Sequence, residues 1–471
     1  MVGRKEEQRL LLELASSGES EFVVVYGRRR VGKTYLIRET FGSSFFFSYT
    51  GIANTDAKQQ RMAFAKALCD YGWRTNEGGA FAPNSWFDAF DALRALISAV
   101  STDGRLLLFI DEIPWMDNKK SDFVPAFEHF WNGWASGQKN IMLIVCGSAA
   151  SWITKKIFRN KGGLYNRVTR QISLKPFTLS ECAEFFSDRG VELNTQDIIE
   201  SYMIFGGIPY YLRMMEKRFS LAQNVDRICF GETAPLRYEY DRLMDTLFSS
   251  PKKYTIVLEA LHAKKKGLPR ETIANLIDFG NGGNLTRILS ELEECGLISS
   301  YKPFGKARNG TLYHLSDPFI AFHLTYIRKT NSDNFWSSFT DNSAHRAWSG
   351  YAFEQVCLAH IKQIKKALGI SGIHTDTSSW ISRGGDRGAQ VDLVIDRADR
   401  VISLCEMKFT KGPFEIDRAY DLALRGKIEV FRTETKTRKA LHLTMITTYG
   451  VKPGKYAGLV QSEVSMDELF G

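Results

Sequence analysis

The sequence predicts an α/β fold, with a parallel sheet in the N-terminal third and a smaller α/β unit at the C-terminal end. Between residues 22 and 174, short apolar runs such as "FVVVY" and "IMLIVCGS" alternate with stretches of helical spacing. This alternation is typical of parallel strands that helices cover on both faces. After residue 344, a long helical pattern precedes two further apolar runs, "VDLVID" and "VISLCEMKF", which we interpret as strands.

The composition is ordinary for a folded, soluble protein. At 471 residues, with 44% hydrophobic and 24% charged residues, the chain is long enough for about two to four domains. No apolar run reaches the roughly 18 residues of a membrane-spanning helix, and the N-terminus is amphipathic. We therefore expect a cytoplasmic protein with no membrane partner. The net charge of +9 permits binding to a polyanion without requiring it.

The cysteines and histidines give no sign of a zinc site. The seven cysteines are scattered without a CxxC pair, and several lie in apolar runs, so we expect reduced, buried thiols. The eight histidines show no HExxH or similar ligand spacing. The sequence therefore favours chemistry that does not depend on zinc.

The stretch "GRRRVGKT" matches the phosphate-loop pattern GxxxxGK[ST] in full and lies between a predicted strand and a predicted helix. Glycines in this pattern let backbone N–H groups surround a phosphate at a helix N-terminus. Lys33 is expected to reach the β and γ phosphates of ATP, and the Thr34 hydroxyl to coordinate Mg²⁺. The nucleotide-binding residues expected in this segment are Gly27, Arg30, Gly32, Lys33, Thr34 and Tyr35.

Two later strands are predicted to complete the nucleotide site. The run "LLLFIDE" places Asp111 at the carboxyl end of a buried strand, where it can hold Mg²⁺, and Glu112 follows in position to polarise the attacking water. The run "IMLIVCGS" ends at Ser148, which can contact the γ-phosphate or that water. An ordinary serine at a strand end remains the alternative. Arg167 and Arg170 are candidates for an arginine finger, in cis or from a second copy, so a homo-oligomer stays open.

Four segments, "YGRRRVGKT", "LLLFIDEIPWM", "CGSAASWI" and "GGIPYYL", together resemble the archaeal and bacterial P-loop ATPases of the AAA and STAND type, over about residues 1–240. The resemblance implies an ATPase core over residues 1–175 and a helical lid over 176–245. It also implies that Pro209 lies near the adenine. Within the lid, Thr178 and Glu181 form a capping-box pattern that predicts the start of a helix.

Residues 250–325 contain two helical segments joined by "DFGNG" and followed by a hairpin with a basic tip, an order that resembles a winged helix-turn-helix. Asn284 and Arg287 are then expected near the start of the recognition helix. The wing residues expected to meet phosphate are Lys302, Lys306 and Arg308. The acidic outer face of "ILSELEECGL" opposes DNA contact, so a lid or oligomerisation role is the alternative.

The strands "VDLVID" and "VISLCEMKF" predict a hairpin that carries Asp392, Glu406 and Lys408. Glu406 and Lys408 are two residues apart and share one face of their strand. Asp392 shares that face only if the connecting loop holds an odd number of residues, such as three, or if the hairpin carries a bulge. If so, Asp392 and Glu406 can chelate Mg²⁺ while Lys408 orients or activates a water, and Glu354 on the preceding helix completes the metal site.

The order Glu, Asp, Glu-x-Lys resembles the PD-(D/E)xK, or restriction-endonuclease-like, superfamily, and predicts such a domain over residues 344–471. Val391 stands where the motif's name has proline, and Gln390 is a candidate supporting residue beside the acid. The resemblance implies a Mg²⁺-dependent nuclease with DNA as the partner.

Three functions are consistent with the whole sequence. The first is an ATP-hydrolysing switch that controls a DNA-directed nuclease. The second is a DNA-binding or signalling ATPase whose C-terminal domain is catalytically inactive. The third is a structural scaffold that binds nucleotide without turnover.

Overall fold

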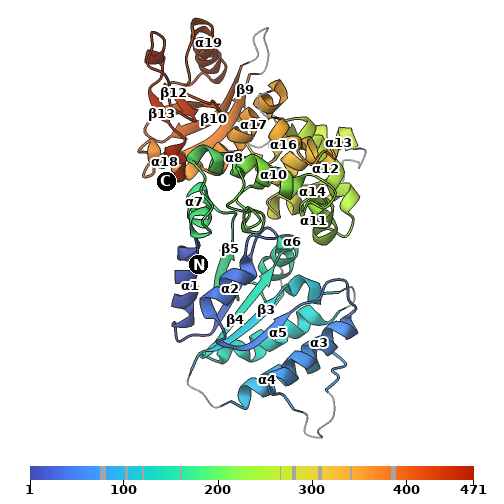
Figure 1. The fold of residues 1–471 in the computed structure, drawn as a ribbon. Helices are drawn as coiled ribbons and strands as arrows, with labels where there is room; N and C mark the ends of the chain where they lie inside the picture. Colours follow the sequence, from blue (N-terminus) through green and yellow to red (C-terminus); the bar gives the residue numbers. More distant parts are fainter. Residues whose placement is uncertain are drawn as a thin grey trace. The chain divides into compact units, whose positions relative to one another are not determined.

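The computed structural model describes residues 1–74, 81–100, 104–118, 121–159, 162–265, 267–277, 283–305, 310–339, 342–382 and 389–471. The chain divides into two compact units, Met1–Pro176 and Phe177–Gly471. Each unit is described by itself below. Figure 1 labels many of their elements.

The first unit is built on a five-stranded parallel sheet (Figure 1) with the strand order β2-β3-β4-β1-β5. The strands are β1 (Glu21–Tyr26), β2 (Phe45–Thr50), β3 (Leu106–Asp111), β4 (Ile141–Gly147) and β5 (Arg170–Ser173). Because all strands are parallel, their carboxyl ends meet at one edge of the sheet. That edge gathers the residues that follow β1, β3 and β4.

Helices cover both faces of this sheet, as the sequence predicts. Phe22 and Val24 of β1 pack in a core with α3, α4 and α5, while Val23 and Val25 point the other way and are also fully buried. The helices are α1 (Lys5–Ala15), α2 (Lys33–Phe41), α3 (Ala57–Asp70), α4 (Trp86–Ser98) and α5 (Phe123–Gly133). The α/β fold with a parallel central sheet is therefore confirmed for this unit.

The second unit begins with short helices: α7 (Leu179–Asp188), α8 (Thr195–Phe205), α9 (Pro209–Leu212), α10 (Leu221–Cys229) and α11 (Glu239–Leu247). The predicted capping box is present at the start of α7. The Thr178 hydroxyl accepts from the backbone N–H of Glu181, and the Glu181 carboxylate accepts from the backbone N–H of Thr178 at 2.8 Å. Both otherwise unsatisfied N–H groups of this helix end are thereby paired.

Three helices and a three-stranded antiparallel sheet follow in this unit. The elements are α12 (Pro251–Ala263), β6 (Leu268–Pro269), α13 (Arg270–Ile277), α14 (Gly283–Glu294), β7 (Ile298–Tyr301) and β8 (Leu312–Leu315). The strand order is β6-β8-β7, so β8 lies between the short β6 and its hairpin partner β7. Buried side chains of α12, α13 and α14 form one core with this sheet.

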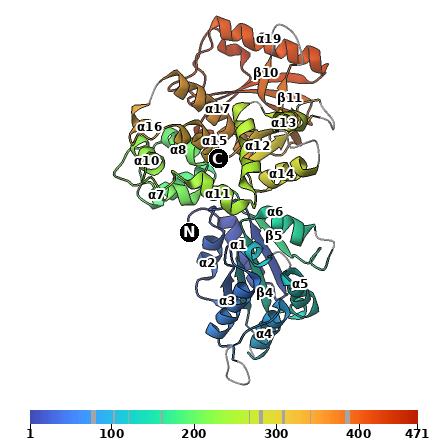
Figure 2. The ribbon, with the colours of Figure 1, turned by 90° about the vertical axis from the view of Figure 1, so that its right-hand side faces the viewer.

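The last part of the chain forms a mixed five-stranded sheet with the order β13-β12-β11-β10-β9. Its strands are β9 (Thr375–Ile381), β10 (Gln390–Arg397), β11 (Val401–Lys408), β12 (Ala440–Thr447) and β13 (Ser462–Val464). β9, β10 and β11 pair antiparallel, whereas β12 is parallel to β11. The parallel pair needs a crossover, which α19 (Arg418–Thr435) supplies. Figure 2 shows α19 beside this sheet.

The long helix predicted after residue 344 is interrupted. α17 (Ser343–Ala359) ends at His360, and α18 (Ile361–Ala367) follows. The buried ring of His360 contacts the oxygen of Val356 through Nδ1 at 2.8 Å and accepts from the backbone N–H of Leu179 through Nε2 at 3.0 Å. The helical pattern of this segment cannot predict the break, because it depends on a contact with Leu179 of α7, which lies far away in the chain.

All seven cysteines are free thiols, and six of them are buried, as the sequence predicts. Within the described ranges, no helix is both long and apolar enough to cross a membrane.

Candidate active sites

The loop between β1 and α2 has the backbone that a phosphate loop needs. A side chain at Gly27 would place Cβ 2.2 Å from the backbone oxygen of Leu174, so only glycine fits there. Gly32 caps α2 with a φ of 92°, a conformation that glycine adopts without strain. The N-terminus of α2 therefore begins directly at the predicted phosphate site.

Lys33 is the buried cation of this loop. Its ammonium group donates to the backbone oxygens of Gly27 and Arg28 at 3.1 and 3.2 Å. Burial lowers the pKa of Lys33, while the charges of Glu112 and Asp111 oppose that shift. A lysine held among acceptors in a low-dielectric site is suited to bind a phosphate group.

Thr34 and Asp111 form the predicted metal-binding pair. The Thr34 hydroxyl donates to Oδ2 of Asp111 at 2.7 Å. Burial raises the pKa of Asp111, and the hydrogen bond from Thr34 works against this rise. Adjacent hydroxyl and carboxylate oxygens are the donor types that Mg²⁺ prefers, so these two residues fit a magnesium ion.

Glu112 is held in place by two partners. It has a φ of 48°, which is unusual for a residue with a side chain, and its N–H donates to Oδ1 of Asp111 at 3.0 Å. Its Oε2 accepts from both the backbone N–H and the hydroxyl of Ser148, at 3.0 and 2.9 Å. The sequence predicts a catalytic role for Glu112, but it does not reveal that Ser148 is its partner.

The other predicted nucleotide contacts of the first unit differ in exposure. Tyr35 is 59% exposed, while Arg30 is half-buried with a φ of 73°. Arg167 and Arg170 are both exposed, and the choice between them as an arginine finger stays a prediction.

Pro209 belongs to the second unit, where it occupies the first turn of α9. A side chain at Gly207 would place Cβ 2.3 Å from the oxygen of Phe177, so this turn requires glycine. The structure therefore gives a reason for the glycine before Pro209 that is independent of nucleotide. The contact of Pro209 with adenine stays a prediction.

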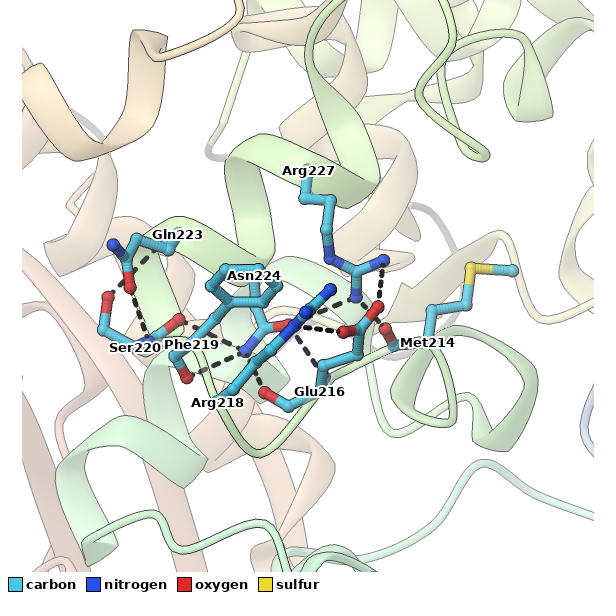
Figure 3. A network of polar contacts seen from close by, with 8 residues as sticks. All are labelled: Met214, Glu216, Arg218, Phe219, Ser220, Gln223, Asn224 and Arg227. Atoms are coloured by element: carbon cyan, nitrogen blue, oxygen red, sulfur yellow. Dashed lines mark hydrogen bonds and ion pairs between the residues drawn. The ribbon is translucent and has the colours of Figure 1, made fainter.

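A polar network fixes the segment that follows α9 (Figure 3). Asn224 is fully buried, and its amide group donates to three backbone oxygens within residues 216–220. Its Oδ1 accepts from the N–H of Glu216 at 2.9 Å. Arg227 pairs with the Glu216 carboxylate, with 3.0 Å between Nη1 and Oε1. These hydrogen bonds and the ion pair hold the loop before α10 to that helix.

In the C-terminal sheet, the register meets the parity condition stated above. Leu393 pairs with Cys405 and Asp396 with Ile402, and three residues, 398–400, connect the two strands. Continuing this register by one residue sets Asp392 opposite Glu406. Asp392 Oδ2 also accepts from the backbone N–H of Met407 at 3.2 Å.

Glu406 is almost fully buried and is paired with a lysine that the sequence analysis does not identify. Lys427 of α19 donates to Oε1 of Glu406 at 2.5 Å, and the Tyr420 hydroxyl lies 3.5 Å from Oε2. Burial and then the charge of Asp392 raise the pKa of Glu406, while Lys427 opposes this. The site therefore contains its own counter-cation.

Lys408 and Glu354 belong to the same cluster. The ammonium of Lys408 lies 5.4 Å from the ring centre of Tyr420. Burial, followed by the charge of Asp392, raises the pKa of Glu354 to about 8, and Glu406 adds to this rise. Lys408 and Lys265 oppose the rise, so carboxyls and ammonium groups from several elements share one electrostatic environment.

In the parts of the chain that the structure describes, no group of three or more His, Cys, Asp or Glu side chains has a geometry that could hold a metal ion. The predicted ligands Glu354, Asp392 and Glu406 provide the oxygen donors that suit Mg²⁺. The charge of Asp392 raises the pKa of both Glu354 and Glu406, yet the three carboxyls are not gathered around one point. The donor chemistry therefore fits Mg²⁺, but binding requires the side chains to move.

Lys427 and Tyr420 are the site residues that sequence reasoning missed. They are seven residues apart, which is about two helical turns, so the sequence does indicate that they share a face of α19. It does not indicate that this face covers the Asp392–Glu406 hairpin. That information comes only from the packing of α19 on the sheet.

The predicted recognition helix α14 directs its first charged side chain along its own axis. Arg287 donates to Oδ1 of Asn284 at 3.0 Å and lies 3.6 Å from the carboxylate of Glu291. Lys302 is exposed near the end of β7. The predicted wing contacts Lys306 and Arg308 lie outside the described residues.

Residues 1–215 match a family described as an ATPase domain predominantly from Archaea. The matched range contains the loop with Lys33, the Thr34–Asp111 pair and the Glu112–Ser148 pair. The match and this geometry together support a P-loop ATPase domain that binds and hydrolyses ATP.

One curated relative extends the similarity beyond this domain. An uncharacterized protein of Methanocaldococcus jannaschii is 26% identical over 417 residues, covering 87% of this chain and 87% of that protein. Because 417 residues exceed the range of the family match, the similarity continues into the second unit.

Two solved structures have lower similarity. The Walker-type ATPase of Pyrococcus abyssi is 16% identical with a TM-score of 0.47, and the match covers 70% of this chain and 96% of that one. The ORC2 protein of Aeropyrum pernix, solved as ADPNP–ADP complexes, is 15% identical with a TM-score of 0.43, with coverage of 70% and 94%. Both TM-scores are below 0.5, so the ATPase assignment rests on the family match and the site geometry.

Proposed function

We propose that this protein is an ATP-hydrolysing switch whose second unit carries a Mg²⁺-dependent, DNA-directed nuclease site. The observation that carries the nuclease proposal is the register of the β10–β11 hairpin. Continued by one residue beyond the Leu393–Cys405 pair, it sets Asp392 opposite Glu406, with Lys408 two residues further along. The buried charge cluster with Glu354 supports the same proposal, because buried carboxyls with raised pKa values are costly to a fold and gather at functional sites.

In the ATPase part, Lys33 binds the β and γ phosphates, and Thr34 and Asp111 hold Mg²⁺, which when bound neutralises phosphate charge. Glu112 orients the attacking water and accepts its proton as the γ-phosphate is transferred to water, which releases ADP. Ser148 positions Glu112 through its two hydrogen bonds. Pro209 is proposed to contact the adenine.

In the nuclease part, Glu354, Asp392 and Glu406 would hold Mg²⁺, which when bound supplies positive charge next to the scissile phosphate. Lys408 orients the water that adds to phosphorus. One P–O bond of the DNA backbone breaks as this water adds, and the proton that the water loses ends on the departing oxygen. Lys427 keeps the buried Glu406 carboxylate paired and oriented.

The modules of the second unit have proposed identities as well. The element order α12-β6-α13-α14-β7-β8 supports a winged helix over residues 250–325, and α7 to α11 support a helical lid over residues 176–245. Arg287 is engaged by Asn284 and Glu291 on its own helix, which favours a coupling role for α14 over base contacts. A PD-(D/E)xK fold over residues 344–471 is the matching proposal for the mixed sheet.

A regulatory ATPase with an inactive C-terminal domain is the second candidate. The Lys427–Glu406 pair favours it, because an ammonium group that occupies a ligand carboxylate also suits a site that never binds metal. An AAA or STAND type of ATPase core, a cytoplasmic location and a homo-oligomer with Arg167 or Arg170 as its finger remain predictions under both candidates.

The deciding experiment measures Mg²⁺-dependent cleavage of plasmid and branched DNA, with and without ATP. We expect cleavage by the wild type, loss of cleavage in Lys408→Ala and Glu406→Ala, and altered cleavage in Lys33→Ala. Lys455→Ala, which changes an exposed lysine of the same unit, is the matched control. Intact ATP hydrolysis with no cleavage of either substrate would instead establish the regulatory ATPase.

A scaffold that binds nucleotide without turnover is tested separately. Glu112→Gln should retain ATP binding and lose hydrolysis, because the amide cannot accept the proton of the water. Equal phosphate release by Glu112→Gln and wild type would contradict the role given to Glu112.

A further inference from the structure

Lys265 lies in the turn between α12 and β6. This turn belongs to the helical module of residues 250–325, which precedes the C-terminal sheet. Its side chain is exposed, and it follows Lys264 directly in the sequence "AKKKG". No motif in the sequence connects this turn with the acidic residues, the first of which is almost ninety positions away at Glu354.

The fold brings this turn to the helix that carries Glu354. The ammonium of Lys265 lies 5.1 Å from the ring centre of Tyr351 in α17, within cation–π range. The Tyr351 hydroxyl in turn donates to the backbone oxygen of Leu315 in β8 at 3.4 Å. Tyr351 and Glu354 are three residues apart on one helix, so they lie on the same side of it.

A second contact attaches the same module to the C-terminal sheet. The N–H of Phe304, just after β7, donates to the backbone oxygen of Ser379 in β9 at 2.9 Å. The Phe304 ring packs against Phe431 of α19 at 5.1 Å between ring centres. The turn with Lys265 is therefore held against α17, and the hairpin of the same module is held against β9 and α19.

The ammonium group of Lys265 rests on the ring of Tyr351, about one helical turn from Glu354. Among the described residues, Lys265 forms no ion pair with a carboxylate. An ammonium group that rests on an aromatic ring beside a carboxyl cluster retains its N–H donors for an anion that enters the site.

We propose that Lys265 is a phosphate-binding residue of the acidic site, supplied by the preceding helical module to hold the backbone of a DNA strand beside Glu354. This inference rests on the proposed nuclease function and deepens it. Its consequence is that the DNA-binding surface is composite: residues 344–471 carry the acids and Lys408, while the module before them carries one of the cations.

The test compares full-length Lys265→Ala with Lys264→Ala, which removes the same charge one residue earlier in the same turn. Binding of a short labelled DNA duplex is measured in EDTA over a series of salt concentrations, so the readout does not depend on bound metal. Loss of one phosphate contact should reduce the salt slope of log K by about 0.9 in Lys265→Ala. Lys264→Ala and Lys265→Arg should both keep the salt slope of the wild type.

The outcomes separate this inference from the nuclease proposal. A reduced slope in Lys265→Ala supports the inference, whether or not the wild type cleaves DNA in Mg²⁺. Equal slopes for Lys265→Ala, Lys264→Ala and wild type overturn it, even if cleavage is present. A Lys265→Ala variant with altered Mg²⁺ dependence of cleavage and an unchanged salt slope also overturns it, because Lys265 then acts only through Glu354. A wild type that does not bind the duplex overturns the inference, and cleavage by that wild type would leave the nuclease proposal standing.

Discussion

The nucleotide site and the acidic site each contain a buried carboxylate that is a proposed metal ligand, Asp111 and Glu406, but they hold these carboxylates differently. In the first unit, Glu112 accepts hydrogen bonds from the uncharged Ser148, and Asp111 accepts one from Thr34. In the second unit, Glu406 pairs with the ammonium group of Lys427. Neutral donors can be exchanged for a metal and phosphate without leaving a charge behind, whereas Lys427 must find a new partner if Mg²⁺ binds Glu406.

Because of this difference, variants of the two sites are expected to fail in different ways and need different measurements. Loss of a residue at the nucleotide site should affect catalysis more than folding, because the hydroxyl and N–H donors there are uncharged and their loss leaves no unpaired ammonium group. Loss of a charge at the acidic site should affect folding as well, because it leaves the buried partner of the Lys427–Glu406 pair without a counter-charge.

The largest effect is expected for Lys33→Ala. Removing the cation that binds the β and γ phosphates should lower ATP hydrolysis on the order of 100-fold or more, with little change in unfolding temperature. Phosphate release and thermal melting check this, with Lys66→Ala on the exposed side of α3 as the control. Hydrolysis at the wild-type rate in Lys33→Ala would show that ATP is not bound and hydrolysed at the loop that carries Lys33.

The second effect is acid destabilisation, and it belongs to the second unit. Burial lowers the pKa values of His262, His314 and His323 to about 4, below the usual value near 6.5. Between pH 6.5 and 4 the unfolded chain binds protons that the folded chain does not, so stability is intact above pH 6.5 and falls as the pH drops to 4. Each histidine contributes a slope of up to about 1.4 kcal/mol per pH unit.

Urea unfolding from pH 7.5 down to pH 4.5, followed by a probe in the second unit, measures this slope. The raised pKa of Glu354, about 8, acts in the opposite direction over this window, so the same series is measured with Glu354→Gln. A free energy of unfolding that stays constant with pH in that variant would show that these histidines are not buried in the neutral form.

The third effect concerns the Lys427–Glu406 pair. Lys427→Met leaves Glu406 buried without its cation and should lower the free energy of unfolding by about 3 kcal/mol. Adding Glu406→Gln should recover part of this loss, because the buried charge is removed as well. A double-mutant cycle by urea unfolding gives the coupling energy, and a value near zero would indicate that the pair is not formed in solution.

The smallest effect is expected for Ser148→Ala. The loss of the hydroxyl donor leaves the backbone N–H on Glu112, so kcat for ATP hydrolysis should fall about tenfold while KM stays nearly constant. Ser44→Ala, an exposed serine of the same unit, serves as the control. A change confined to KM would indicate that Ser148 contacts the nucleotide and not Glu112.

Features that depend on local sequence pattern could be predicted from the sequence. The phosphate loop of Gly27 to Thr34 combines fixed spacing with glycines at positions where the backbone requires them, and the apolar run before Asp111 specifies a buried strand. The relation of Asp392 to Glu406 followed from strand period and loop parity, since a period of two leaves few alternatives once the loop length is known.

Which distant side chains share a site depends on how the elements pack, and could not be predicted from the sequence. Ser148 meets Glu112 because β3 and β4 are neighbours in the sheet, and Lys427 meets Glu406 because α19 packs on the hairpin that it follows. Lys265 reaches the surroundings of Glu354 through contacts between separate modules. The break at His360 has the same origin, a hydrogen bond from Leu179. Periodicity describes how one segment presents its own faces, whereas these contacts depend on which faces of other segments cover them.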